Sequence, residues 1–505
     1  MSKMKYQMSE EQCKILNAKG NIVVTANAGA GKTFILVEKI NKIIEENKGH
    51  KTIAAITFTR KAANEIKNRL KNDTSNIYVG TNDSFVLEEI IRPFFKDIYD
   101  TKFSSELEPD YQLKVENSKQ GIDIMLSQHI IPKFKDNKKN FNFRLAKYIL
   151  ENSKIARTYL KSKYNYVFID EYQDSDTDMH NFFMYLNEKL GINLFVVGDE
   201  KQSIYIWRGA NPESFMSLTR NENFEHYRLS ENYRSCQPIK NYAYIFSGEM
   251  NMFKSVENNK EVLAINCTEC HEIIPQIINN INNDKRIAIL TFQKNDAKAL
   301  AEQFTQFGLE MKYIILPPVE DISTHDKWLY SSIAKLIYLK DYNIYSFLDD
   351  IPFEISRNDR NTIKKYLKQI PAFTNQKEIL NVQINALFNI LDYKLLNSKF
   401  EKLYETINNN IYGNWYNLEN IKNVSMTLHT SKGLEFDQVI LLAKDFSLNT
   451  QENKNLHYVG ITRAKEKMII IFEKNYSKQY LDILVEKMQT LPSDYKMILN
   501  MKKCY

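Results

Sequence analysis

Cysteine is scarce in this chain, which has five cysteines among 505 residues. So few thiols in so long a chain argue against a disulfide framework and favour a reducing compartment. The run Cys267-Thr268-Glu269-Cys270-His271 spells the attachment pattern of a c-type haem. We reject that interpretation because no export signal accompanies it. A zinc site would need further ligands, and the sequence has no second cysteine pair.

Long apolar runs are missing as well. No stretch of about 18 apolar residues is present, so nothing predicts a membrane span. Residues 1–7 lack the apolar core of a signal peptide, and we therefore expect a cytoplasmic protein without membrane partners. The formal charge of +6 fits a polyanionic partner without requiring one. The length predicts about two to four domains.

One short segment carries most of the information in the sequence. Between the apolar strand at 22–24 and the helical stretch at 34–43 stands the run Ala26-Asn27-Ala28-Gly29-Ala30-Gly31-Lys32-Thr33. Strand, glycine turn and helix start are the setting of a P-loop, whose backbone N–H groups wrap a polyphosphate. Lys32 would reach the β- and γ-phosphates, and Thr33 would hold Mg²⁺. Ala26 replaces the usual first glycine; a glycine turn that binds nothing is the alternative.

A second acidic motif follows another apolar strand. The run 166–174 places Asp170 and Glu171 directly after Val167–Ile169. Asp170 would complete the metal site, and Glu171 would accept a proton from the attacking water. An acidic pair at a strand end is often only a solvated turn, but the P-loop upstream favours the catalytic interpretation.

Apolar strands alternate with amphipathic helical stretches along the chain, which predicts parallel α/β layers. The motifs fall into the blocks 8–85, 166–235, 286–308 and 424–472, whereas 87–163 and 318–420 are mostly helical. This pattern predicts two α/β cores, each interrupted by an insertion. The clearest strand candidates are Thr52–Thr57, Val167–Ile169, Leu194–Val197, Ile287–Leu290, Val439–Leu442 and Met468–Phe472.

The ordered motifs resemble those of superfamily 1A helicases of the UvrD/Rep/PcrA type. The blocks that resemble motifs Ia, III, IV, V and VI are Ile56–Ile66, Val197–Ala210, Glu231–Ser235, Thr427–Phe436 and Tyr458–Ala464. The resemblance implies two RecA-like P-loop domains and ATP-dependent DNA helicase activity, with 3′ to 5′ polarity. It assigns 1–86 and 164–226 to domain 1A, 87–163 to insertion 1B, 227–317 and 421–505 to domain 2A, and 318–420 to a reduced insertion 2B.

The same resemblance implies catalytic roles for three further residues. Gln202 would sense the γ-phosphate, and Arg234 and Arg463 would act as arginine fingers. A surface arginine that only makes a salt bridge is the alternative for each arginine.

The nucleotide itself would be held by residues outside the P-loop too. Gln12 would read adenine, Tyr233 would stack on the base and Glu435 would bind the ribose. Phe34 stands where the family often has arginine, which predicts looser base choice. ATP is the expected nucleotide, with other NTPs or dNTPs as further substrates, together with Mg²⁺.

A nucleic-acid track is implied by five positions in the motifs Ia and III. Stacking rings and cations that grip single-stranded DNA would be Phe58, Lys61, Tyr205, Trp207 and Arg208. The alternative is that these aromatic side chains belong to the core.

A narrower resemblance is carried by 80–85, 89–94 and 174–181, which are similar to the GajB family, the UvrD-like subunits of Gabija anti-phage systems. It implies a hetero-oligomer with GajA, an OLD-family nuclease with a Toprim domain. A motor that senses DNA ends or single strands would activate that nuclease. The alternatives are a stand-alone 3′–5′ DNA repair helicase and a non-catalytic DNA-binding scaffold.

Overall fold

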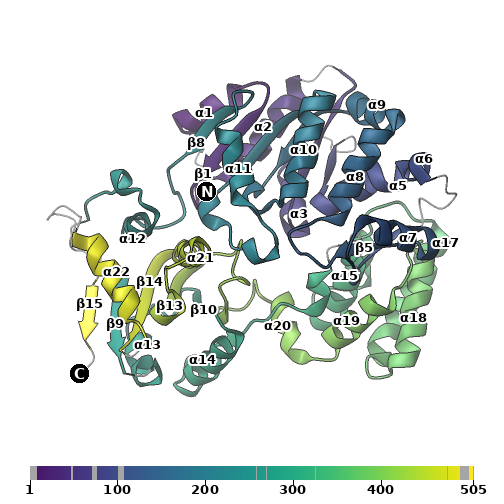
Figure 1. The fold of residues 1–505 in the computed structure, drawn as a ribbon. Coiled ribbons are helices and arrows are strands. Elements are labelled where there is room, and N and C mark those ends of the chain that lie inside the picture. The colour runs from purple at the N-terminus through teal and green to yellow at the C-terminus, as the bar shows by residue number, and fades with distance from the viewer. Residues whose placement is uncertain are drawn as a thin grey trace. The chain divides into compact units, whose positions relative to one another are not determined.

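The chain divides into two compact units, each with its own sheet (Figure 1). The first unit comprises 1–254 and 447–462, and the second comprises 255–446 and 463–505. The computed structural model describes residues 8–46, 49–70, 77–99, 107–256, 259–268, 270–322, 324, 326–474, 476–489 and 500–503.

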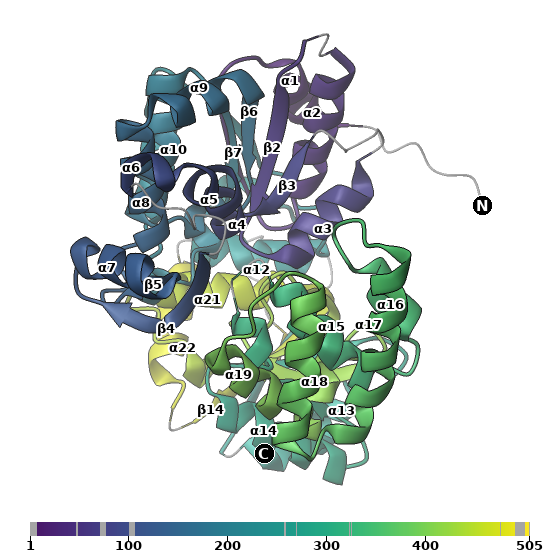
Figure 2. The ribbon, with the colours of Figure 1, turned by 90° about the vertical axis from the view of Figure 1, so that its right-hand side faces the viewer.

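The sheet of the first unit is six-stranded and parallel, in the order β3-β2-β6-β7-β1-β8. Figure 2 shows β2, β3, β6 and β7 side by side, with α2 and α10 on opposite faces. The strands are β1 (Ile22–Ala26), β2 (Thr52–Thr57), β3 (Tyr78–Thr81), β6 (Tyr164–Ile169), β7 (Asn193–Gly198) and β8 (Glu225–Leu229).

Alternation along each strand divides the core of this unit between the two faces of the sheet. Ile22 and Val24 pack on one face, whereas Val23 packs on the other. Because both faces are covered, the interior strands β2, β6, β7 and β1 are mostly apolar, whereas the edge strand β8 is not. Helices on the first face are α1 (Glu10–Asn17), α2 (Lys32–Glu46) and α3 (Arg60–Arg69); those on the second include α10 (Thr177–Leu190) and α11 (Pro212–Thr219).

The insertion at 87–163 shares the core of the second face. Phe134, Phe141 and Phe143 belong to the same buried cluster as Val167 of the sheet. The insertion also contains a parallel strand pair, β4–β5. Its elements and those leading into it are α4 (Asn82–Val86), the π-helix η1 (Leu87–Ile91), α5 (Arg92–Phe94), α6 (Lys96–Tyr99), β4 (Glu108–Val115), α7 (Ser118–Gln128), β5 (Ile130–Phe134), α8 (Phe141–Asn152) and α9 (Lys154–Lys163).

Two helices belong to the first unit although we expected their residues in the second α/β core. They are α12 (Gln237–Ser247) and α21 (Gln451–Ile461), which pack on each other. The pairing of β8 (225–229) with β1 carries the residues that follow, including α12, into the first unit. The helix α21 joins it by packing on α12 and through Asn455, whose side chain donates to the carbonyls of Glu200 and Ser203.

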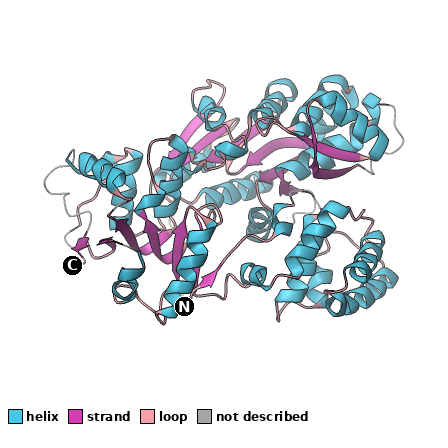
Figure 3. Ribbon diagram, turned by 60° about the horizontal axis from the view of Figure 1, so that its bottom comes forward, coloured by secondary structure: helices cyan, strands magenta, loops and turns pink. Residues whose placement is uncertain are grey.

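The second unit has a seven-stranded parallel sheet in the order β11-β12-β10-β13-β14-β9-β15. In Figure 3 its strands, in magenta, are flanked by helices in cyan. The strands are β9 (Val262–Cys267), β10 (Ile287–Thr291), β11 (Lys312–Tyr313), β12 (Asn423–Thr427), β13 (Phe436–Leu442), β14 (Ala464–Glu473) and β15 (Asn500–Lys503). The flanking helices are α13 (Ile274–Ile278), α14 (Lys294–Gln306) and α22 (Lys478–Gln489).

Residues 318–420 form a helical insertion with its own buried cluster, in which Leu329, Phe347 and Phe388 are fully buried. Figure 2 shows these helices together, in green. They are α15 (Lys327–Tyr338), α16 (Ile344–Asp349), α17 (Arg357–Gln369), α18 (Lys377–Ile390), α19 (Asn397–Ile407) and α20 (Gly413–Tyr416).

The predicted fold class, two parallel α/β cores with insertions, is confirmed, and each predicted strand lies within an observed one. Among the described residues, no helix combines the length and the apolar character that crossing a bilayer requires.

Candidate nucleotide site

The P-loop connects β1 to α2 at the carboxyl end of the first sheet. Gly29 and Gly31 have φ angles of +71° and +84°, a region that glycine enters without the steric cost of a Cβ. The loop closes on itself through the Ala30 N–H, which donates to the Asn27 carbonyl at 3.1 Å. Because α2 begins at Lys32, its first N–H groups face the loop, which favours an anion there.

A second segment, 230–235, packs directly on this loop. The Tyr233 N–H donates to the carbonyl of Gly29 at 2.9 Å. A Cβ at Gly29 would collide with the side chains of Asn232 and Arg234, so glycine is required there by space as well as by φ. The structure therefore brings the predicted Tyr233 and Arg234 to the P-loop, through a backbone contact that their sequence separation did not reveal.

The predicted metal ligands lie together, Thr33 in the first turn of α2 and Asp170 directly after β6. The Thr33 hydroxyl donates to Asp170 Oδ2 at 3.4 Å. Burial, and next the charge of Glu171, raise the pKa of the Asp170 carboxyl, whereas Lys32 opposes that rise. A hydroxyl beside a buried carboxylate is the oxygen donor set that Mg²⁺ prefers when substrate phosphates supply further ligands. In the described part of the chain, no three His, Cys, Asp or Glu side chains gather into a metal cluster.

Glu171 has a backbone conformation that is unusual for a glutamate. Its φ and ψ angles are +54° and +38°, in the left-handed region, which costs on the order of 1 kcal/mol or more for a residue with a Cβ. Its N–H donates to Asp170 Oδ1 at 2.9 Å, and its carboxylate accepts from Gln173 Nε2. These bonds fix where the carboxylate lies, which suits a group that must meet one water molecule.

Gln173 also connects this carboxylate to Gln202. Its Oε1 accepts the Asp199 N–H at 3.0 Å, and Asp199 Oδ2 in turn accepts from Gln202 Nε2 at 2.6 Å. All these side chains are buried or nearly so. The roles of Gln173 and Asp199 were not predicted from the sequence. The available signal was a polar side chain just after a buried strand, one residue after β7 for Asp199 and four after β6 for Gln173.

Arg234 and the P-loop are both contacted from the segment at 447–462. Arg234 Nη1 donates to the Thr462 carbonyl at 3.2 Å, and the Tyr458 hydroxyl accepts the Ala28 N–H at 3.2 Å. This contact of Tyr458 with the P-loop was not predicted from the sequence. The place of Tyr458 in the block that resembles motif VI was the available signal.

Two predicted nucleotide contacts lie at one rim of the loop. Gln12 is buried and forms a capping box with Ser9 at the start of α1. A Cβ placed on Gly31 would lie 3.5 Å from Gln12 Nε2 and 3.8 Å from the Cβ of Phe34. Both side chains therefore border the same turn.

The predicted DNA track is centred on the 3₁₀ turn η5 (Ile206–Arg208). Trp207 is 54% exposed, so it is not a core residue. The Arg208 guanidinium carbon lies 4.6 Å from the Trp207 ring centroid and 5.4 Å from that of Tyr205. Phe58 packs partly against the core, and Lys61 is exposed in the first turn of α3. This turn thus presents a stacked cation and indole to solvent.

The remaining predicted residues, Glu435 and Arg463, belong to the second unit. Arg463 is 1% exposed and donates from Nη1 to the Leu434 carbonyl at 2.9 Å. Glu435 forms an ion pair with Lys465. Their roles toward a nucleotide stay predictions.

Two family models match the chain. The model described as the UvrD/REP helicase N-terminal domain matches residues 8–147 and 101–223, and that of the UvrD-like helicase C-terminal domain matches 338–475.

Individual relatives agree with these matches. The chain is 36% identical to Gabija protein GajB of Bacillus cereus (strain VD045), over 95% of this chain and 98% of that protein. It is 23% identical to the ATP-dependent DNA helicase Rep of Buchnera aphidicola subsp. Schizaphis graminum (strain Sg), over 90% of this chain and 91% of that protein. It is 24% identical to a probable DNA helicase II homolog of Rickettsia conorii, over 91% of each.

Proposed function

Because the chain belongs to the UvrD/Rep family of ATP-dependent DNA helicases, we propose that it is a DNA-stimulated nucleoside triphosphatase that senses DNA ends or single strands. The observation that supports this most is the meeting of Lys32, Thr33 and Asp170 at the carboxyl end of one parallel sheet. Ligands bind at that edge in open α/β sheets.

The first unit supplies groups for each part of phosphoryl transfer to water. Lys32 and the α2 N-terminus would hold the phosphates, and Thr33 with Asp170 would hold Mg²⁺. The metal, when bound, neutralises charge that develops on the phosphates. Glu171 would take the proton of the attacking water. Arg234 would stabilise the transferring group, since arginine fingers accelerate such reactions by about 10³–10⁵.

Base recognition would be modest. Tyr233, half exposed, would stack on the base, and Gln12 and Phe34 would border it. Glu435 would hold the ribose. With Phe34 in place of a cation, we expect ATP to share the site with other NTPs or dNTPs.

We assign the two RecA-like domains and their insertions as the family layout implies. Insertion 1B would be 87–163, and the reduced insertion 2B would be 318–420. Single-stranded DNA would stack on Trp207 beside Arg208, since each base stacked on an aromatic ring contributes about 1–3 kcal/mol.

A role in Gabija defence is the most specific part of the proposal. It rests on the identity of 36% to Gabija protein GajB over nearly the full length of both proteins. The chain would assemble with a GajA-type nuclease and activate it when DNA ends or single strands stimulate hydrolysis.

Hydrolysis by the purified full chain tests the proposal, with no DNA, closed circular duplex, or linear DNA carrying single-stranded ends. We expect stimulation by the linear DNA alone. Lys32→Ala should abolish hydrolysis in every condition. Equal hydrolysis with and without DNA would contradict the coupling, and hydrolysis by Lys32→Ala near the wild-type rate would contradict the nucleotide site.

A stand-alone helicase is the second candidate, favoured by the likeness to Rep and DNA helicase II proteins. Robust unwinding of a duplex with a 3′ tail by this chain alone would support it. Unwinding or nuclease activity that needs the GajA-type partner would support the first proposal.

A further inference from the structure

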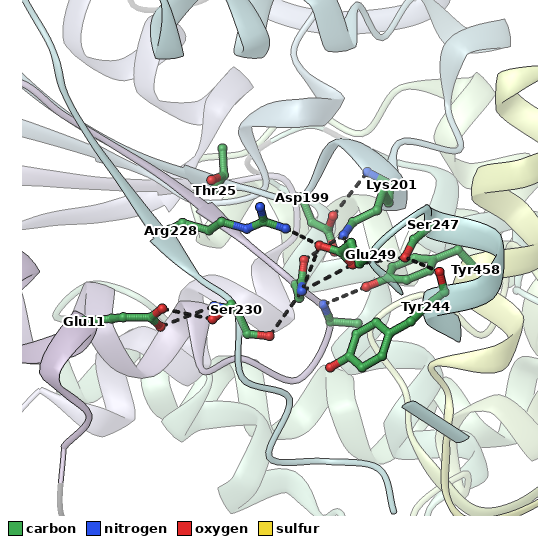
Figure 4. A network of polar contacts seen from close by, with 12 residues as sticks. Glu11, Thr25, Asp199, Lys201, Arg228, Ser230, Tyr244, Ser247, Glu249 and Tyr458 are labelled. Atoms are coloured by element: carbon green, nitrogen blue, oxygen red, sulfur yellow. Dashed lines mark hydrogen bonds and ion pairs between the residues drawn. The ribbon is translucent and has the colours of Figure 1, made fainter. Parts of the chain in front are cut away.

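A buried carboxylate outside the catalytic groups joins several segments of the first unit. Glu249, which follows α12, is 8% exposed. Its carboxylate accepts hydrogen bonds from Lys201 Nζ at 2.8 Å, Ser247 Oγ at 3.0 Å and Asn27 Nδ2 at 3.3 Å. It also forms an ion pair with Arg228. Figure 4 shows the side chains of Lys201, Arg228 and Ser247 converging on it.

The charges within this group balance in favour of an ionised glutamate. Burial raises the pKa of Glu249, but Lys201, Ser247 and Arg228 together outweigh burial, and the net pKa is lowered. Charge-assisted hydrogen bonds are stronger than neutral ones, so the Lys201 ammonium is held firmly in place.

That ammonium reaches the start of the P-loop. Lys201 Nζ donates to Asn27 Oδ1 at 2.7 Å, and Asn27 Nδ2 donates to the Ser230 carbonyl at 3.1 Å. Asn27 therefore has both ends of its amide engaged, between β1 and the segment that carries Tyr233 and Arg234.

Lys201 also belongs to the turn that carries Gln202. Its own N–H donates to Asp199 Oδ1 at 3.1 Å, while Asp199 Oδ2 accepts from Gln202. One side chain thus ties the P-loop to the turn of the predicted γ-phosphate sensor.

A tyrosine extends the connection to the next residue of the loop. Lys201 Nζ lies 5.2 Å from the ring centroid of Tyr458, whose hydroxyl accepts the Ala28 N–H. A cation beside an aromatic ring is attracted to it, which favours this position of the tyrosine.

We propose that Glu249 and Lys201 are positioning residues for nucleoside triphosphate hydrolysis. They fix the position of Asn27 relative to Gln202, so that the P-loop and the predicted γ-phosphate sensor contact the same nucleotide. This inference rests on the proposed function and adds to it two residues that touch no phosphate themselves.

The double substitution distinguishes a positioning role from a purely structural one, because the two roles predict different effects on catalysis once stability is restored. Removing one partner leaves the other charge buried and uncompensated, which destabilises a protein; removing both relieves that cost. Stability should therefore return in the double variant. Asn27 would still lack its anchor, so the catalytic defect should persist.

The experiment compares Glu249→Gln, Lys201→Met and the double variant with the wild-type full chain. Thermal midpoints, kcat and KM for ATP are measured with saturating single-stranded DNA. We expect kcat/KM to fall about 10- to 100-fold in all three, as for supporting residues of other active sites. The midpoint should fall in the single variants and recover in the double one.

Glu213→Gln is the matched control, because Glu213 forms an exposed ion pair with Arg220 in the same unit; it should change neither quantity. Recovery of kcat/KM together with the midpoint in the double variant would overturn the inference, as would wild-type kcat/KM in Glu249→Gln. Failure of the wild type to hydrolyse ATP would overturn the proposed function as well, so the two failures are distinguishable.

Discussion

At the scale of single residues, substitution of Lys32 is the most direct test of the proposed nucleotide site. It starts α2 and faces Asp170, whose pKa it lowers against the effects of burial and Glu171. We predict that Lys32→Ala reduces kcat by at least about 10²-fold, the effect of losing one transition-state donor. Steady-state hydrolysis checks this, and an unchanged thermal midpoint controls for folding. Hydrolysis near the wild-type rate would contradict the P-loop assignment.

Glu171→Gln separates binding from chemistry. The amide keeps the size of the side chain but cannot accept a proton from water. We predict that turnover falls about 10²- to 10⁴-fold while ATP binding is retained. Filter binding and single-turnover hydrolysis measure the two. Fast turnover would mean that another group is the base.

Trp207→Ala tests the exposed indole. Because Trp207 is 54% exposed, we predict a stability change within about 0.5 kcal/mol. Single-strand affinity should fall by about 1–3 kcal/mol while DNA-free hydrolysis stays.

Arg208→Ala is the companion variant for the charge. It should reduce the slope of log affinity against log salt by about 0.7 for one lost phosphate contact, a slope that Trp207→Ala leaves alone. Unchanged affinity in both variants would remove η5 from the DNA track.

Sequence patterns predicted the residues that we propose for catalysis, but not the residues that form hydrogen bonds around them. Lys32 and Asp170 stand in local patterns with a chemical meaning. Gln173, Asp199 and Glu249 gain their roles from bonds to residues far away in sequence, such as the 222 positions between Asn27 and Glu249. No local pattern specifies such bonds.

At the scale of elements, strands buried on both faces were predictable and β8 was not. The strands at 52–57 and 194–197 are apolar runs, whereas β8 reads Glu225-His226-Tyr227-Arg228-Leu229 and buries only its last residue. Among the described strands it lies at the edge of its sheet and pairs only with β1. Polar side chains are typical of sheet edges, so this strand lacks the apolar run by which the other strands were predicted.

The helix α21 illustrates the same limit. Its residues 455–461 are all buried, whereas its first turn, 451–454, is polar and partly or fully exposed. A helix of this kind lacks the amphipathic pattern that would predict which core it joins. Its amide side chain at Asn455 donates to the carbonyls of Glu200 and Ser203, in the first unit.

A buried histidine on α21 gives a pH prediction. Burial lowers the pKa of His457 to about 3, and its ring packs edge to face on Phe246 at 4.4 Å. Between about pH 3 and 6.5 the unfolded chain binds a proton there that the folded chain does not. Stability from this group is therefore lost as pH falls below about 6.5, by about 1.4 kcal/mol per pH unit.

Thermal midpoints of the wild type and His457→Gln between pH 7.5 and 5.5 measure this effect. The variant cannot titrate at that position, so its midpoint should depend less steeply on pH. His271→Gln, at an exposed position, should follow the wild type. Parallel curves for wild type and His457→Gln would show that the histidine is accessible to protons in the folded state.

For the whole molecule, the number and type of the cores followed from the sequence, but the division of the chain between them did not. Two motif-bearing blocks flanking helical stretches predicted two sheets with insertions. The assignment of 447–462 to the first unit depends on packing of α21 and not on its neighbours β13 and β14. Such packing unites segments hundreds of residues apart.

The insertion at 318–420 offers a test at this scale. It has its own hydrophobic core, and its ends adjoin β11 and β12, which are hydrogen-bonded neighbours. We predict that replacing it with a short Gly/Ser linker keeps DNA-independent hydrolysis within a few-fold of wild type. Hydrolysis and circular dichroism check this. Loss of hydrolysis with the fold retained would place a required group in the insertion.

The left-handed backbone of Glu171 has a consequence for engineering. Glycine adopts that conformation without a steric cost. Replacing Glu171 by glycine would also remove the charge repulsion between the carboxylates of Glu171 and Asp170. Glu171→Gly would relieve both costs, against the loss of the hydrogen bond from Gln173 to the carboxylate, while it removes the proposed base. A campaign that selected variants by thermal endurance alone would not penalise the loss of the proposed base, and it would retain any stabilised variant at this position that binds nucleotide without turning it over.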